Sequence, residues 1–129
     1  MPNNQTIMGL HFRYRLCIAE MNSHINILRI FDDYIDELRS KKNEAAVKNG
    51  IESFQQQFVG LRKEIDELRH EMHLAKMTLA ASSKQLKDAD KKSVSKGNHS
   101  ELKKRYAAYK KNFEQVKKEF GQFESKWLK

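Results

Sequence analysis

Glutamate and histidine residues in a helical protein can form metal centres, and one pair in this chain has the spacing of such a centre. Glu67 and His70 match the Glu-x-x-His pattern of ferritin-like di-iron proteins, in which both side chains project into the core. Here Leu68 lies on the apolar side of the same segment, so Glu67 and His70 are expected on its outer side. The motif also occurs as a single copy. The sequence therefore predicts no dedicated metal site at this motif.

Three histidines could together act as metal ligands. His70 and His73 lie one turn apart, and His11 is expected level with His73 in a helical hairpin. Exposed histidines on neighbouring helices bind zinc or nickel adventitiously, but a dedicated site also needs partners that orient the imidazoles. A metal- or haem-binding bundle is therefore only a third hypothesis, and no cofactor is expected.

His24 is the one polar residue in an otherwise apolar series of positions. We expect it to hydrogen-bond a carbonyl or hydroxyl group, or to fix the register of its helix, rather than to bind a ligand. Protonation near pH 6 would charge a buried position, and Glu20 lies one turn before it on the same side. Cys17 belongs to the same series and is expected to be an inert small hydrophobe.

No arrangement of residues typical of an enzyme is visible. The chain has no glycine-rich phosphate loop, no nucleophile elbow and no pair of carboxylates on an inward face. Its single cysteine also excludes an intrachain disulfide framework. We therefore expect a protein without catalytic activity.

The elements that would position these residues follow from hydrophobic spacing. Apolar residues recur in alternating steps of four and three, a heptad pattern typical of helices packed in coiled-coil fashion. The three series run from Leu10 to Leu38, from Val47 to Leu86 and from Leu102 to Trp127, with His24 and Ser82 as the polar exceptions. The predicted fold is an all-α, antiparallel three-helix coiled-coil-like bundle, a long helical hairpin plus a third helix. The helices are expected near 6–39, 44–86 and 100–128, with a mobile basic loop at 87–99.

Length and composition agree with this fold. The 129 residues suit a single domain, and five glycines with one proline are too few for a turn-rich β protein. No apolar run approaches the ~20 residues of a membrane span, and no basic-then-apolar export signal opens the chain. We therefore expect no transmembrane segment and a cytoplasmic location.

If the chain turns back tightly in the predicted loop 87–99, the third helix is expected to cover only part of the hairpin. In that register Trp127 lies near Phe58, and the hairpin end lacks a third helix. Helix one is also apolar over most of its circumference there, either because it is the central helix of the monomer or because a second copy covers it. We favour a homodimer, whose expected interface consists of Ile27, Ile30, Phe31, Tyr34, Ile35, Ile51 and Phe54.

The net charge of +8 is unevenly distributed. Residues 87–129 hold thirteen Lys or Arg against six Asp or Glu, a net charge of +7. Adjacent lysine pairs recur every seven residues on the side expected to lie opposite the aromatic series. This basic face consists of Lys103, Lys104, Lys110, Lys111, Lys117 and Lys118. It is either a solvated surface or a site for phosphates or an anionic membrane surface.

Two functional hypotheses follow from these patterns. The first is a non-enzymatic interaction or scaffolding bundle that self-associates. The alternative is an electrostatic binder of nucleic acid or anionic surfaces, which would be weak and blind to sequence because Arg105 is the only arginine on the third helix. The six aromatic residues of that helix all lie on its heptad series, which favours core packing over base stacking.

Overall fold

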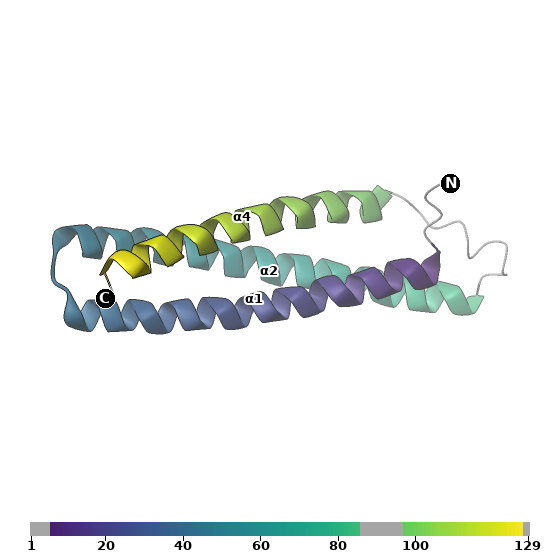
Figure 1. Ribbon diagram of the computed structural model, residues 1–129. Helices are drawn as coiled ribbons and strands as arrows, with labels where there is room; N and C mark the ends of the chain where they lie inside the picture. The colour runs from purple at the N-terminus through teal and green to yellow at the C-terminus, as the bar shows by residue number, and fades with distance from the viewer. Residues whose placement is uncertain (1–5, 86–96, 128–129) are drawn as a thin grey trace.

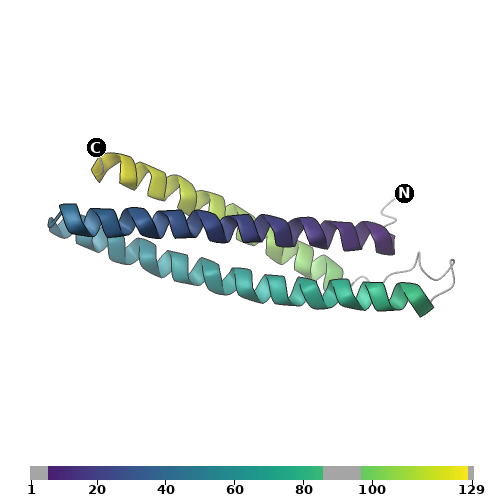
Figure 2. The same ribbon diagram turned by 90° about the horizontal axis from the view of Figure 1, so that it is seen from below.

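Three long helices make up the part of the protein that the structure describes. The computed structural model describes residues 6–85 and 97–127. The helices are α1 (Ile7–Lys41), α2 (Ala45–Gln85) and α4 (Gly97–Trp127). α1 and α2 form an antiparallel hairpin, and α4 runs along it in the direction of α1 (Figures 1 and 2). The predicted all-α three-helix bundle is confirmed.

The ends of the helices differ slightly from the predicted ones. Thr6 caps α1, because its side chain accepts a hydrogen bond from the Gly9 amide at 2.9 Å. α4 begins at Gly97, so the last three residues of the predicted loop 87–99 are helical. Most of that loop lies outside the described residues. Within the described residues, no helix has a stretch both long and apolar enough to cross a bilayer.

The three heptad series form the core. Every position of these series whose side chain the structure describes is buried or half-buried. Met21, Leu28 and Ile35 of α1 are fully buried, as are Ile65 and Leu68 of α2. The period of 3.5 residues therefore predicted which side of each helix faces its neighbours.

The predicted register of the third helix is wrong by about one heptad. The ring of Phe120, rather than Trp127, packs against Phe58, with centroids 5.4 Å apart. α2 extends past the beginning of α4, and α4 reaches almost to the hairpin turn (Figure 1). A shift of seven residues is about 10 Å along a helix and leaves the same side chains facing inward. Hydrophobic spacing therefore cannot distinguish the two registers.

This shift removes the main argument for the predicted dimer interface. Phe31 packs on Phe120 with centroids 4.7 Å apart, and Phe54 packs on both Phe120 and Phe123 at 5.2 and 5.1 Å. Ile35 and Ile51 are buried within the single chain. The expectation that the hairpin end lacks a third helix is wrong, because Phe120 and Phe123 of α4 pack on Phe31 and Phe54 there.

Three residues of the predicted interface remain accessible. Ile30 and Tyr34 are exposed, at 51% and 44%, and Ile27 is half-buried. All three lie on α1. In the predicted interface, these three residues still have accessible apolar surface outside the core of the single chain.

Glycines at three helical positions give a test of the register. An ideal Cβ at Gly50 would lie 2.3 Å from the ring of Phe123, whereas at Gly60 and Gly121 it would meet nothing within 4 Å. Gly60→Ala and Gly121→Ala are expected to stabilise the protein by about 0.5–1 kcal/mol each, because glycine costs helix entropy. Gly50→Ala is expected to give no gain or a loss, since Phe123 must leave its place. Urea unfolding followed by circular dichroism measures all three, and an equal gain at all three positions would contradict the packing of Phe123 on Gly50.

Candidate functional site

The polar groups of the interior gather between α1 and α4. His24 of α1 is 6% exposed, and its Nδ1 lies 2.6 Å from the hydroxyl oxygen of Tyr109 on α4. Its ring stacks on Phe113 with centroids 3.8 Å apart and planes 8° from parallel. The expectation that His24 hydrogen-bonds a hydroxyl group is confirmed.

Burial determines the protonation of this histidine. Burial lowers the pKa of His24, and the ammonium groups of Lys110 and Lys117 lower it further. The carboxylates of Glu20 and Glu114 act in the opposite direction. The imidazole is therefore held neutral at pH 7. In that state it accepts a hydrogen bond at one nitrogen and donates at the other.

A carboxylate joins the same two helices one turn earlier. Tyr106 of α4 donates its hydroxyl hydrogen to Glu20 of α1, and the Lys110 ammonium lies 3.5 Å from the same carboxylate. The hydrogen bond from Tyr106 lowers the pKa of Glu20, so the carboxylate stays charged near neutral pH. Burial raises the pKa of Tyr106. Tyr106 is therefore a permanent donor to this carboxylate.

A second tyrosine–histidine pair lies at the N-terminal end of α1. The hydroxyl oxygen of Tyr14 hydrogen-bonds Nδ1 of His99 on α4. Here the tyrosine belongs to α1 and the histidine to α4, the reverse of the pair formed by His24 and Tyr109. Burial raises the pKa of Tyr14 to about 12 and lowers that of His99. Together with Glu20, these pairs form what we call the tyrosine–histidine network.

The network links α1 to α4 through three side-chain hydrogen bonds, from Tyr14 to His99, from His24 to Tyr109 and from Tyr106 to Glu20. Within the described part of the chain, no buried side-chain nitrogen or oxygen lacks a hydrogen-bond partner. Cys17 is half-buried, and burial raises the pKa of its thiol, which disfavours the reactive thiolate. Buried and partly buried hydrogen bonds of this kind specify how the two helices dock.

The candidate metal-ligand histidines do not belong to the tyrosine–histidine network. Glu67, His70 and His73 are exposed on α2, as predicted for Glu67 and His70, and His11 is half-buried on α1. Among residues 6–85 and 97–127, no group of three or more His, Cys, Asp or Glu side chains is placed to hold a metal ion.

The basic face follows the outer side of α4. Five of its six lysines are exposed, and Lys110 is half-buried beside Glu20. None of these five forms an ion pair with a carboxylate of the described residues; they are Lys103, Lys104, Lys111, Lys117 and Lys118. Arg105, by contrast, donates to both carboxylate oxygens of Glu71 at 2.8 Å, which ties α4 to α2.

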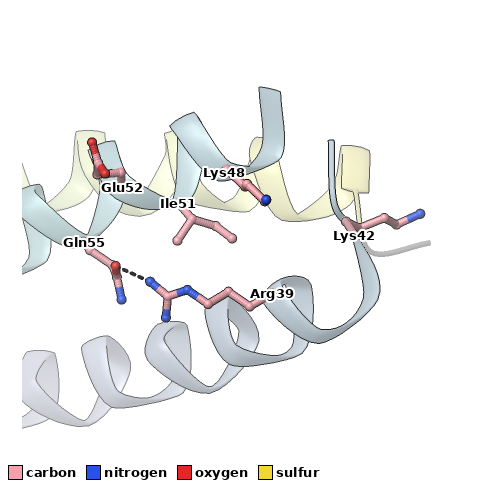
Figure 3. Close-up of a pocket in the computed structure, with 6 residues that line it drawn as sticks. All are labelled: Arg39, Lys42, Lys48, Ile51, Glu52 and Gln55. Atoms are coloured by element: carbon pink, nitrogen blue, oxygen red, sulfur yellow. Dashed lines mark hydrogen bonds between the residues drawn. The ribbon is translucent and has the colours of Figure 1, made fainter. Parts of the chain in front are cut away.

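An open pocket lies beside the hairpin turn. Figure 3 shows Arg39 hydrogen-bonded to Gln55 at 2.5 Å, with Lys48 and Ile51 beside them. Lys42 and Glu52 complete its lining. The positive side chains are extended at its rim, and Glu52 partly offsets their charge. The pocket has the features of a solvent-filled gap at a helix turn rather than a built ligand site.

Large apolar side chains also remain on the surface, and α1 carries most of them. Five of the eight exposed large apolar residues of the described chain belong to α1, and three belong to α2. Those of α1 are Met8, Phe12, Leu16, Ile30 and Tyr34. Met8, Phe12 and Leu16 follow one another at intervals of four, so they lie along one side of the helix.

The sequence pointed to His24, with Glu20 one turn before it, but not to the tyrosines or to His99. Tyr14, Tyr106 and Tyr109 occupy core positions of their series, and a buried tyrosine hydroxyl needs a hydrogen-bond partner. That requirement was the available signal. His99 falls within the predicted loop 87–99, whereas in the structure it belongs to the first turn of α4.

In the part of the chain that the structure describes, the fold is a three-helix bundle whose α1 and α4 are linked by the tyrosine–histidine network. Comparisons of the chain with protein-family models, with curated proteins and with solved structures found no match.

Proposed function

We propose that this protein is a non-enzymatic interaction or scaffolding bundle that binds another protein through the exposed side of α1. The observation that carries the proposal is the apolar row of Met8, Phe12 and Leu16, which are 78%, 59% and 54% exposed. Side chains of this size are rarely left together in water without a partner. The same helix buries its other side in the core, so the exposed row is not needed for the fold.

Photo-crosslinking tests this proposal. A photoreactive phenylalanine analogue at Phe12 is expected to give an adduct of defined mass in cells of the native source. The same analogue at Gln56, an exposed position of α2, is the matched control. An adduct of twice the chain mass at position 12 would identify the partner as a second copy, the homodimer favoured by the sequence. Identical adducts at both positions, or no adduct at position 12, would contradict the proposal.

The second candidate is an electrostatic binder of nucleic acid or an anionic surface through the basic face. The five lysines without ion pairs favour it, because free ammonium groups neutralise phosphates at little cost. Such binding to duplex DNA would weaken with salt, with a slope of about −0.9 in log K against log salt for each phosphate.

A further inference from the structure

The border between α1 and α4 combines apolar surface with unpaired positive charge. Glu20, Ile27 and Tyr34 are spaced seven residues apart and so form one line along α1. Glu20 contacts both Tyr106 and Lys110 of α4, so this line borders α4. Leu16 and Ile30 belong to the next line outward and are about half exposed, at 54% and 51%.

The facing side of α4 carries lysines at the same interval. Lys103, Lys110 and Lys117 are spaced seven apart, and the contact of Lys110 with Glu20 places their line against α1. The positive charge of Lys117 also lowers the pKa of His24 of α1, which supports the placement of this line of lysines beside α1. Lys103 and Lys117 have no ion-pair partner among the described residues. The apolar residues of α1 and the lysines of α4 therefore run side by side.

We infer that this α1–α4 border binds an acidic amphipathic helix from a partner protein. The inference rests on the proposed function and adds the chemistry of the partner. Such a helix would place its apolar stripe over Leu16, Ile27, Ile30 and Tyr34 of α1. Glutamate or aspartate residues at heptad intervals would then meet Lys103 and Lys117 of α4. With such a helix bound at this border, the three-helix bundle becomes a four-helix bundle.

Charge and shape favour a helix over a nucleic acid here. Nucleic acid would use the lysines alone, whereas the border places them beside the exposed aliphatic side chains of Leu16 and Ile30, which lie two heptads apart on one side of α1. The one arginine of α4, Arg105, is engaged by Glu71 and does not belong to this border. Of the ionisable residues of α4, eight are Lys or Arg and four are Glu, a net charge of +4 that attracts an acidic partner.

A designed peptide is the probe for this border. It has about 21 residues, three heptads, with leucine at the core positions and glutamate at the flanking positions. Fluorescence anisotropy of the labelled peptide measures its binding to the full chain at physiological salt. The wild type is expected to bind this peptide at least about tenfold more tightly than a scrambled peptide of the same composition. Equal binding of the scrambled peptide would overturn the inference, because simple charge attraction would then suffice.

Variants of exposed residues locate the site. Lys103→Glu with Lys117→Glu is expected to weaken peptide binding at least about tenfold, while Lys48→Glu with Lys63→Glu on α2 makes the same change of charge and leaves binding unchanged. Ile30→Ser is expected to weaken binding, and Val59→Ser, also at an exposed apolar position, is its control. Equal effects of the paired variants would overturn the inference.

Two further outcomes separate this inference from its alternatives. Tighter binding of duplex DNA or anionic vesicles than of the peptide, unaffected by Ile30→Ser, would overturn it in favour of the electrostatic candidate. A specific adduct at position 12 in the crosslinking experiment, together with no binding of the acidic peptide, would overturn this inference alone. The proposed function would then stand with a partner of different chemistry.

Discussion

Phe120→Ala is expected to lower the free energy of unfolding by about 3–5 kcal/mol, a large part of the stability of a small domain. The Phe120 side chain is 1% exposed and contacts Phe31, Phe54 and Phe58 from the other two helices. Removing its ring leaves a cavity where all three helices meet. Urea unfolding followed by circular dichroism measures the loss.

Two controls make this result specific. Phe12→Ala makes the same chemical change at a side chain that is 59% exposed and is expected to alter stability by less than about 0.5 kcal/mol. A double-mutant cycle of Phe31→Leu and Phe120→Leu is expected to give a coupling energy of about 0.5–1.5 kcal/mol. Additive effects in that cycle would argue against the observed register, because Phe31 contacts Phe120 only when α4 reaches the hairpin end.

Periodicity predicted the helices and their inner sides, but not how far one helix slides along another. A helix displaced by seven residues presents the same residue classes to its partner, so Phe120 or Trp127 satisfies the pattern opposite Phe58. The choice depends on particular contacts, such as the ring of Phe123 against the bare backbone of Gly50. It also depends on the pairing of Arg105 with Glu71. Contacts between individual residues of this kind do not appear as a repeating pattern in the sequence.

The tyrosine–histidine network was only partly predictable for the same reason. The polarity of His24 within an apolar series signalled a hydrogen-bond partner, and its identity followed only from the register. A third helix displaced by seven residues would place Val116, rather than Tyr109, beside His24. Equally, His99 reaches the hydroxyl group of Tyr14 only because α4 begins at Gly97.

Mild acid is expected to destabilise the bundle before its carboxylates are protonated. Burial lowers the pKa of both His24 and His99 below the ordinary value of 6.5. The unfolded chain therefore binds protons near pH 6 that the folded chain does not. As a result, the free energy of unfolding decreases as the pH is lowered through this range. The contribution of Glu20, whose pKa is lowered from 4.5, is lost only at lower pH. The loss of stability due to the two histidines is thus expected to begin as the pH falls below about 6.5, before Glu20 is protonated.

Unfolding by urea at pH 7.5, 6.0 and 5.0 measures this loss, and variants assign it. Tyr109→Phe alone is expected to cost about 1–3 kcal/mol at pH 7.5, because it leaves a buried imidazole nitrogen without its partner. His24→Leu combined with Tyr109→Phe removes both polar groups, so this double variant is expected to lose less stability than the wild type between pH 7.5 and 5.0. His70→Gln, at an exposed histidine, is expected to retain the full dependence. A wild type equally stable at pH 7.5 and 5.0 would mean that the folded bundle accepts a proton on His24 as readily as the unfolded chain, and that the stacked imidazole is not held neutral by its burial.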